Sequence, residues 1–470
     1  MNSQNIIKAG ICWFVLGVFA FQTTGLADGV VYKSTKDSPY FSMVREDRQV
    51  AYINYVNGVQ HMIISVVAGF ESGKEEDIKD IVWIFPLPAK PEDVSIDIVK
   101  DFRMFHEGLN VETKVMDNKR RWAGFTLTSQ VFPAPLLLLF PLFRVRNVEL
   151  DRSMNFLDGK GSITEYMSVR KMGLITKVIT ATDGESFYNY IKEKGAEIPE
   201  EAKSTFQAYI GKNYSFVVSW VDNVQEYIGN LKSNDKKVQR TNHVLQVYVK
   251  FKTDEIYYPM LLTSLYGQEI IGVSLYFAIP VVFSSEGSGR LVYYYLNNKH
   301  EVPPEYVDFY GKEYYGDCVY TLYTGYNDFA SNIKSDLWFK EGKPKNLDRS
   351  IFFIRYFWPL FILCYAFFSA ISSLLAGYIV FNNKETKPSN LRLLGLGLFN
   401  CLTLIGLVLA GNRMFSKNVP AELNELVSKL KDEGIAVSIN PARKFYIWFS
   451  FIFMFFMLGF EIVILGRFLY

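Results

Sequence analysis

The stretch FFIRYFWPLFILCYAFFSAISSLLAGYIVF, residues 352–381, decides the fold class of this chain. A helix needs about 20 apolar residues to cross the hydrocarbon core of a bilayer, and this run is longer than that. Two further apolar runs follow it, at residues 391–410 and 445–469. We therefore expect residues 348–470 to form a membrane domain with three transmembrane helices.

Another apolar run lies near the N-terminus, at residues 11–21, and follows Lys8. Gly25 and Ala27 place small residues at the two positions that a signal peptidase reads. We therefore expect residues 1–27 to be a signal peptide that exports the chain. An uncleaved anchor helix is the alternative, and it would export the following residues equally well.

The polar stretch between these apolar runs begins with strong strand signals. Residues 49–56 and 59–67 are rich in β-branched and aromatic side chains, and they flank Asn57-Gly58. Because Asn-Gly supplies the two positive φ angles of a type I′ turn, this segment is predicted to form a β hairpin. Further strands are expected at residues 80–86, 174–181, 214–221, 244–252, 255–264 and 269–282.

Two short helices are expected after residue 181. Thr182 and Glu185 fit a capping box, in which a hydroxyl and a carboxylate satisfy the first turn of a helix. A second helix is expected to begin at Pro199 and to stop at Gly211.

Strands outnumber helices in the polar stretch, so we predict an α+β fold class. A β-rich extracytoplasmic domain is expected first, with one lobe at residues 28–150 and an α+β lobe at residues 151–347. A C-terminal three-helix transmembrane bundle is expected to follow it.

The segment VWIFPLPAKPEDV, residues 82–94, is the most distinctive of the predicted strands. It resembles the W-[IV]-x-P-x-P-A strand of a prokaryotic exported, membrane-associated family, domain-of-unknown-function family 2330. The resemblance covers about residues 28–284 and implies an extracytoplasmic, membrane-associated protein, with no activity to carry over. Three other segments resemble that family in the same order, at residues 172–178, 209–220 and 251–262.

The middle of the first lobe departs from that family, whose members often have Gly- or Cys-rich sequence there. This chain has instead the apolar, proline-broken run VFPAPLLLLFPLF, residues 131–143. The run is too short to span a bilayer and too rich in proline for a regular helix. It is interpreted either as a buried crossover segment or as a loop whose residues 136–139 touch lipid, with Arg144 and Arg146 at headgroup level.

Composition argues against several classes of protein. A formal net charge of +2 does not fit a nucleic-acid partner, which calls for a concentrated basic surface. Among the four cysteines, Cys12, Cys364 and Cys401 lie in apolar runs. Cys318 is alone in the polar domain, so no disulfide is expected within that domain.

Local motifs for catalysis or cofactor binding are not found. The run GFESGK, residues 69–74, lacks the glycine spacing of a phosphate-binding loop, and Glu75 stands where a magnesium-binding hydroxyl belongs. The four histidines are far apart, so no metal site is expected. We therefore expect no cofactor and no catalytic residue, and we interpret Trp83 and Phe85 as architectural. A site assembled from distant residues is the alternative.

A group of tyrosines in the second lobe is a candidate recognition face. Tyrosine combines a rigid apolar ring with a polar tip, which suits a binding surface. Ordinary strands also favour tyrosine, so a purely structural role is the alternative interpretation. The candidate residues are Tyr293, Tyr294, Tyr295, Tyr314 and Tyr315.

Polar residues in the apolar runs are the other candidates. Glu461, Asn400 and Arg355 lie in or beside the predicted spans, and an ionisable group at membrane depth is a functional candidate by default. Snorkelling or local pairing of Glu461 is the alternative. Asn400 is interpreted as an interhelical hydrogen-bond donor rather than a transport site.

The predicted three spans have a charge conflict. They place the loop at residues 382–390 inside and the longer loop, residues 411–444, outside. The positive-inside rule prefers the reverse, because the longer loop carries more basic residues. An amphipathic helix is expected after Pro420. The basic residues of the longer loop are Arg413, Lys417, Lys429, Lys431, Arg443 and Lys444.

These observations lead to one functional expectation and one alternative. We expect a multi-pass cell-membrane protein whose large N-terminal domain is an extracytoplasmic binding or envelope-assembly module. Its expected partners are membrane lipid and another envelope or membrane protein, not nucleic acid. The alternative is a subunit of a membrane enzyme or transporter that uses the intramembrane polar residues.

Overall fold

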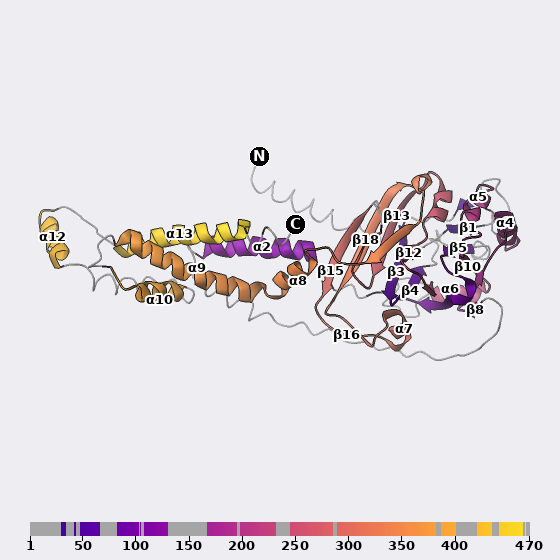
Figure 1. The fold of residues 1–470 in the computed structure, drawn as a ribbon, viewed down its shortest axis with the longest axis horizontal. Coiled ribbons are helices and arrows are strands. Elements are labelled where there is room, and N and C mark those ends of the chain that lie inside the picture. The colour runs from indigo at the N-terminus through magenta and orange to yellow at the C-terminus, as the bar shows by residue number, and fades with distance from the viewer. Residues whose placement is uncertain are drawn as a thin grey trace, which may run out of the picture. The chain divides into compact units, whose positions relative to one another are not determined.

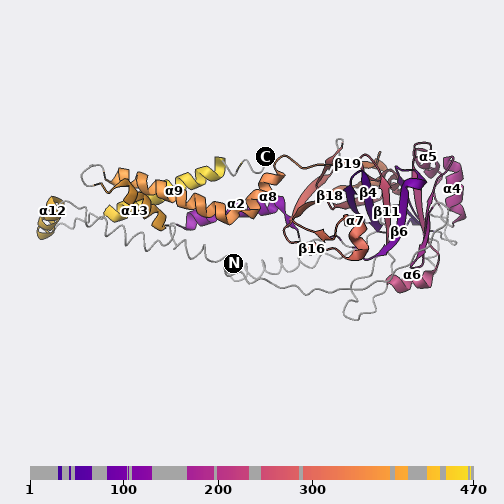
Figure 2. The ribbon, with the colours of Figure 1, turned by 60° about the horizontal axis from the view of Figure 1, so that its bottom comes forward.

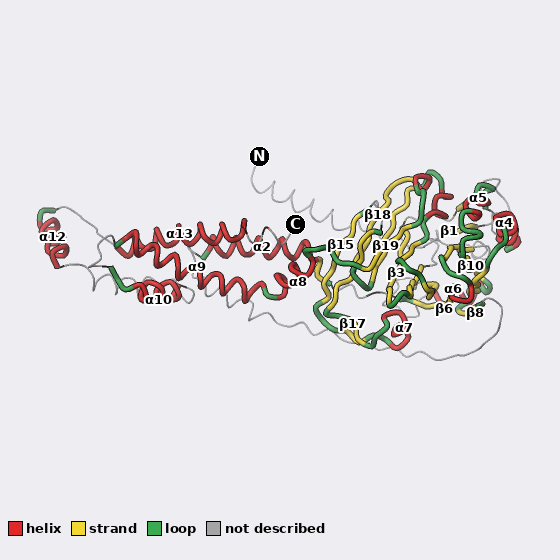
Figure 3. Tube along the Cα trace, viewed as in Figure 1, coloured by secondary structure: helices red, strands yellow, loops and turns green. Residues whose placement is uncertain are grey.

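The computed structural model divides the chain into two compact units, which we name the sheet unit and the helix unit. The sheet unit comprises Met1–Leu109 and Gly159–Pro344, and the helix unit comprises Asn110–Asp158 and Lys345–Tyr470. Strands dominate the first unit and helices dominate the second (Figure 3). The structure describes residues 30–33, 42–43, 48–65, 82–102, 104, 108–129, 167–194, 198–231, 245–284, 289–381, 387–400, 421–434, 441–463 and 466. The predicted signal peptide and the apolar run 131–143 lie outside the described residues.

The larger sheet of the sheet unit has eight strands in the order β6-β11-β4-β3-β13-β18-β15-β7 (Figure 1). Strand β13 runs parallel to β3, and the neighbouring strands from β6 to β15 are otherwise antiparallel. The strands are β6 Val94–Lys100, β11 Leu245–Lys252, β4 Val59–Ser65, β3 Arg48–Val56, β13 Ile270–Phe277, β18 Cys318–Phe329, β15 Arg290–Leu296 and β7 Leu109–Asn110.

A second sheet has six strands in the order β2-β1-β5-β10-β9-β8. Its strands are β2 Ser42–Met43, β1 Val30–Lys33, β5 Val82–Leu87, β10 Ser215–Val221, β9 Leu174–Ile179 and β8 Ser168–Lys171. One small sheet has the order β12-β19-β14, and another pairs β16 with β17. These strands are β12 Ile256–Tyr258, β19 Leu337–Glu341, β14 Val281–Phe283, β16 His300–Glu301 and β17 Tyr314–Tyr315.

The short helices of the sheet unit include two that the sequence predicted. They are α4 and α5, and Gly211 follows α5 with a φ angle of +81°. One hydrophobic core packs α4 and α5 and joins the two large sheets, since it contains Val217 of β10 together with Val247 of β11. The helices are α4 Gly184–Glu193, α5 Ala202–Gln207, α6 Val224–Leu231 and α7 Val307–Tyr310, with 3₁₀ turns at Pro91–Asp93, Leu261–Tyr266, Pro304–Tyr306 and Ala330–Asn332.

The predicted hairpin around Asn57-Gly58 is confirmed. Strands β3 and β4 pair antiparallel, with Val56 opposite Val59. Asn57 and Gly58 have φ angles of 54° and 78°, as a type I′ turn requires. The predicted strand at residues 80–86 is also confirmed as β5, whose six residues are all buried.

Two local predictions are corrected by hydrogen bonds. Asp183, rather than Thr182, caps α4, because its carboxylate accepts from the backbone N–H of Ser186 at 2.7 Å. The strand predicted at residues 255–264 ends at Tyr258 and gives way to the 3₁₀ turn Leu261–Tyr266. The carboxylate of Asp336 accepts the backbone N–H groups at this point, which stabilises the turn.

Among the described residues, the helix unit contains two helices that are long and apolar enough to cross a membrane. They cover Phe357–Val380 and Arg443–Val463. The middle apolar run gives a described helix of 11 residues, so the predicted bundle of three transmembrane helices is not confirmed. The helices of the unit are α2 Val111–Thr128, α8 Leu347–Arg355, α9 Phe357–Val380, α10 Asn390–Asn400, α12 Ala421–Asp432 and α13 Pro441–Val463.

Helix α2 was not predicted, and it belongs to the helix unit although we expected its residues in the first exported lobe. Asn110 caps it by accepting the N–H of Thr113 at 3.0 Å. The ring of Trp122 packs against Phe361 of α9 and Phe460 of α13, with centroids 4.9 Å and 5.6 Å away. The buried residues recur at helical spacing: Val111, Val115, Asn118, Trp122 and Thr126.

Helix α9 is the centre of the helix unit and packs against α10 through small residues. The hydroxyls of Ser369 and Ser373 donate to the carbonyls of Gly397 and Leu393, at 2.7 Å and 2.6 Å. A Cβ atom at Gly397 would lie only 2.5 Å from the Ser369 carbonyl oxygen. The small residues therefore allow α9 and α10 to approach each other closely.

Candidate functional site

The five candidate tyrosines do not share one exposed face. Tyr315 is 1% exposed and Tyr295 is also buried, so neither can meet a partner in this conformation. The hydroxyl of Tyr315 donates to the carbonyl of Ala278 at 2.7 Å. Burial of these rings in the strands overturns the recognition face at these two positions.

The other three tyrosines differ in their surroundings. The hydroxyl of Tyr293 donates to the carbonyl of Val281 at 2.8 Å. Tyr294 stacks on Tyr320, with ring centroids 5.0 Å apart. Tyr314 is 58% exposed. Tyr314 is therefore the member of the candidate set that most freely presents its ring to solvent.

The polar candidates of the helix unit lie on three different helices. Arg355 is exposed at the end of α8, Asn400 ends α10, and Glu461 lies in α13. The charge of Lys119, on α2, interacts with the carboxylate of Glu461. Since α2 was not predicted, this neighbour of Glu461 was not foreseen, and it fits the local-pairing interpretation of Glu461.

An open cavity of about 760 Å³ in the sheet unit is a stronger candidate site. It lies where the β11–β12 turn meets the end of β14, the strand β19 and the segment after β5. We name it the Trp338 groove. Its lining residues are Pro88, Lys252, Thr253, Asp254, Glu255, Ser284 and Trp338.

Hydrogen bonds fix the turn that forms one wall of the Trp338 groove. The hydroxyl of Tyr55 donates to the carbonyl of Thr253 at 2.9 Å, and the N–H of Thr253 donates to the carbonyl of Gly58 at 3.0 Å. The Thr253 hydroxyl donates to the carbonyl of Glu255 at 2.8 Å. The predicted hairpin therefore positions this wall, since both Tyr55 and Gly58 belong to it.

Strand β19 fixes the indole of Trp338. Its backbone pairs with Tyr257 of β12, and its carbonyl accepts the N–H of Ser284 at 3.2 Å. The Trp338 ring also packs against the Tyr257 ring, with centroids 4.8 Å apart. A ring whose backbone is paired on both sides and which packs on a neighbouring ring loses little conformational freedom when it meets a ligand.

A partly buried carboxylate anchors the residues just before β19. Asp336 accepts from the hydroxyls of Tyr209 and Tyr257, at 2.9 Å and 3.0 Å, and from the N–H groups of Met260 and Leu261, at 2.8 Å each. Burial raises the pKa of Asp336, although these hydrogen bonds oppose the shift. Four donors thus anchor the strand two residues before Trp338.

The rim of the Trp338 groove carries both signs of charge. Lys252 and Asp254 are exposed, and Glu255 forms an ion pair with Lys340 at 3.0 Å. The hydrogen bond from Lys340 lowers the pKa of Glu255. An indole and a proline beside mixed charges can bind a ligand that is partly apolar and partly charged. No histidine or cysteine is among the described lining residues.

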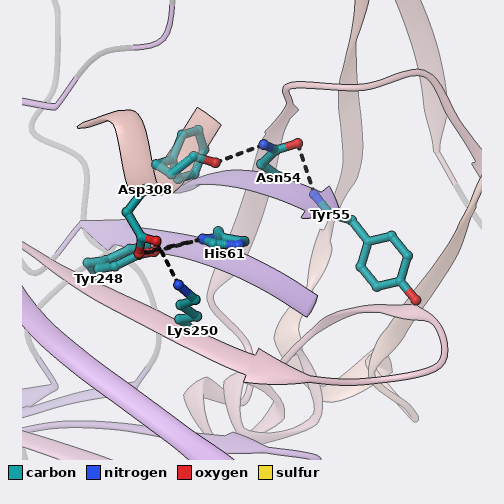
Figure 4. Close-up of polar contacts among 7 residues, drawn as sticks. Asn54, Tyr55, His61, Tyr248, Lys250 and Asp308 are labelled. Atoms are coloured by element: carbon teal, nitrogen blue, oxygen red, sulfur yellow. Dashed lines mark hydrogen bonds and ion pairs between the residues drawn. The ribbon is translucent and has the colours of Figure 1, made fainter. Parts of the chain in front are cut away.

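A second polar group, which we name the His61 cluster, lies on β4, β11 and α7 (Figure 4). The hydroxyl of Tyr248 donates to Asp308 at 2.5 Å, and Lys250 donates to the same carboxylate at 2.6 Å. Nδ1 of His61 lies 2.7 Å from the Tyr248 oxygen. Because the single hydroxyl hydrogen of Tyr248 goes to Asp308, Nδ1 of His61 must carry the hydrogen that bonds to Tyr248.

The electrostatics of the His61 cluster favour a neutral imidazole. Burial lowers the pKa of His61, and the charge of Lys250 adds to this, while Asp308 opposes it. Burial alone would raise the pKa of Asp308, but the hydrogen bonds from Lys250 and Tyr248 outweigh burial and lower it. The cluster ties α7 to the sheet through a charged carboxylate and a neutral histidine.

Sequence reasoning missed Trp338, Asp336 and Asp308. Tyr248 lies 187 residues from His61 in the sequence, so no local motif could indicate that cluster. Helix α2 did have a signal, since Asn110 precedes apolar residues at helical spacing. Comparisons with protein-family models, with curated proteins and with solved structures found no match, so the resemblance of residues 82–94 stays an expectation.

Proposed function

We propose that this chain is a membrane-anchored extracytoplasmic binding module, and that the Trp338 groove holds its partner. The single observation that carries the proposal is the groove itself. It combines a fixed indole with a rim of exposed charges. Anchoring is supported by α9 and α13, which are long and apolar enough to cross a membrane.

The chemistry of the groove favours a polypeptide segment of another envelope or membrane protein. Trp338 and Pro88 suit an apolar side chain, and tryptophan is among the residues that dominate binding energy at protein interfaces. Lys252 and Asp254 suit charges on either side of that anchor. The cavity is open, so an extended segment can lie along it without an opening motion.

Site-specific photocrosslinking in intact cells tests this proposal. A photoreactive amino acid in place of Asp254 should give a discrete adduct, because Asp254 lies on the rim. The same amino acid in place of Lys299, an exposed residue of the sheet unit away from the groove lining, is the matched control and should give none.

Substitution of Trp338 makes the crosslinking test specific to the groove. Trp338→Ala should remove most of the adduct, whereas Trp338→Phe should keep part of it, because phenylalanine preserves an aromatic ring. Equal adducts at both crosslinker positions, or an adduct that ignores Trp338→Ala, would show that the groove does not hold the partner.

A further inference from the structure

The directions of α9 and α13 bear on how the chain crosses a membrane. At one end, Ala376 of α9 shares a hydrophobic cluster with Phe445 and Phe449 of α13. At the other end, Phe361 and Phe460 both pack against the ring of Trp122. The end of α9 therefore lies beside the start of α13, and the two helices are antiparallel (Figure 2).

Three successive crossings would require the first and third helices to be parallel, because each crossing reverses the direction of the chain. In this structure the chain leaves α9 after Val380 and enters α13 at Pro441, at the same end of the pair. If α9 and α13 both span the bilayer, residues 381–440 begin and end on one side. The middle apolar run therefore makes no net crossing.

Helix α10 shows how the middle run begins. Its contacts pair Ser373 with Leu393 and Ser369 with Gly397, so α10 runs back along the second half of α9. The ammonium group of Lys387 lies over the ring of Tyr378. Because Tyr378 is near the end of α9, the residues just before α10 lie at that end. Helix α10 thus packs on the second half of α9, and it begins near the end at which the chain leaves α9.

The shared side of the hairpin is rich in basic residues. Arg392, Lys431, Arg443 and Lys444 are exposed there or in the connecting segment. The connecting segment also carries Lys384, Lys387, Arg413, Lys417 and Lys429, against Glu385, Glu422, Glu425, Asp432 and Glu433. The opposite side carries the basic residues Lys345, Arg349 and Arg355, together with Lys114, Lys119, Arg120 and Arg121 of α2, against the acidic residues Glu112, Asp117, Asp348 and Glu461.

Two crossings remove the charge conflict of three crossings, because the loops on both sides of the middle run then lie on one side of the membrane. Basic residues are similarly numerous at the opposite end, so the cytoplasmic assignment rests on the export of the sheet unit in the proposed function. Helix α12 fits the same surface, since Leu426 is 54% exposed while Lys429 and Lys431 lie in its last turn. Such a helix can rest on a leaflet with its apolar side chains toward the acyl chains.

We propose that α9 and α13 form a two-span antiparallel hairpin whose shared end lies on the cytoplasmic side, where the exposed Lys431, Arg443 and Lys444 contact the phosphate groups of anionic lipids. This inference rests on the membrane anchoring in the proposed function. Attraction of a basic segment to an anionic leaflet weakens with added salt.

Cysteine accessibility in the full chain tests the topology. The four native cysteines are changed to serine, and single cysteines are introduced by Ser389→Cys or Asp432→Cys, with Lys299→Cys as the control in the sheet unit. Both introduced cysteines of the connecting segment should react with an impermeant maleimide only after permeabilisation, whereas the control should react in intact cells. Different reactivity at positions 389 and 432, or reaction of both in intact cells, overturns the hairpin.

An alkaline wash of the membranes separates this inference from the proposed function. A chain that leaves the membrane in the wash contradicts anchoring, and with it both proposals. A chain that stays in the membrane but shows different labelling at positions 389 and 432 contradicts only the hairpin.

Reconstitution of the full chain tests the lipid contact. A fluorophore on Asp432→Cys should be quenched more by headgroup-labelled phosphatidylglycerol than by headgroup-labelled phosphatidylcholine, and salt should reduce the difference. Changing Lys431, Arg443 and Lys444 to glutamine should abolish the preference. The matched change of Lys90, Lys212 and Lys299 to glutamine, all exposed in the sheet unit, should leave it intact. Equal quenching by the two lipids, or equal loss in both variants, overturns the lipid contact.

Discussion

Two buried residues of the sheet unit, Trp83 and His61, differ in how far the sequence could predict their roles. Trp83 was predicted to be architectural, and its side chain is fully buried in β5. His61 carried no predicted role, yet it is buried beside three polar partners from β11 and α7. The burial of Trp83 could be predicted from the apolar run around it. The partners of His61 could not be predicted, because they lie on elements that only the fold brings together.

Trp83→Ala should lower the free energy of unfolding by about 3–5 kcal/mol, as large aromatic truncations in cores do. The indole N–H of Trp83 has no hydrogen-bond partner among the described residues. Trp83→Phe should therefore be milder, because it keeps an aromatic ring and removes an unpaired donor. Urea unfolding of the full chain in detergent measures both. A Trp83→Ala variant that unfolds like wild type would contradict a core role.

The His61 cluster predicts a pH dependence of stability. The pKa of His61 is lowered in the folded state from its ordinary value of 6.5, so the unfolded chain binds the proton more readily. Stability should then be full above about pH 6.5 and fall as the pH drops below it. The Asp308 carboxylate, whose pKa is also lowered, should lose its contribution only at more acidic pH, near its ordinary 3.8.

His61→Gln provides the control for this prediction. The variant has no imidazole to protonate, so the difference in unfolding free energy between wild type and variant should shrink as the pH falls from 7 toward 5. A difference that stays constant over this range would show that burial does not hold His61 neutral.

At the scale of elements, local chemistry explains which predictions succeeded. The β3–β4 hairpin follows from Asn57-Gly58 alone, whereas the end of β12 depends on a carboxylate far along the chain. Helix α2 carries a helical pattern in its sequence, but its place in the helix unit depends on aromatic partners in α9 and α13. Distant partners therefore account for what the sequence could not predict.

Asp336 gives a prediction for β19. Asp336→Ala would leave two tyrosine hydroxyls and two backbone N–H groups without their acceptor, which should cost about 3 kcal/mol or more. Asp336→Asn retains one acceptor oxygen and should be milder. Urea unfolding and the Asp254 crosslink measure stability and the groove together. An Asp336→Ala variant with normal stability and a normal adduct would mean that the carboxylate does not support Trp338.

Glu461 tests the pairing of α2 with α13. We expect Glu461→Gln to leave membrane insertion and the Asp254 adduct unchanged, because the neighbouring Lys119 marks a local interaction. Lys119→Met should also be tolerated when combined with Glu461→Gln. Loss of a proton-linked or transport activity in Glu461→Gln would instead support the alternative of a membrane enzyme or transporter.

At the scale of the whole molecule, the two units have different parts in the proposed function. The sheet unit carries the Trp338 groove, and the helix unit carries the two apolar helices. Helix α2 links the first half of the sequence to the two apolar helices, since the ring of Trp122 packs against α9 and α13. The boundary expected at residue 347 lies close to the division between Pro344 and Lys345, but Asn110–Asp158 also belong to the helix unit, because the amphipathic helix in the expected first lobe was not recognised.

The most direct test of the account asks whether the groove-bearing unit is exported while the chain stays in the membrane. A chain with Lys299→Cys as its single cysteine is treated in intact cells with an impermeant maleimide, and the membranes are then washed at alkaline pH. We predict labelling in intact cells and retention of the labelled chain in the membrane. Labelling only after permeabilisation, or release of the chain by the wash, would contradict a membrane-anchored extracytoplasmic binding module.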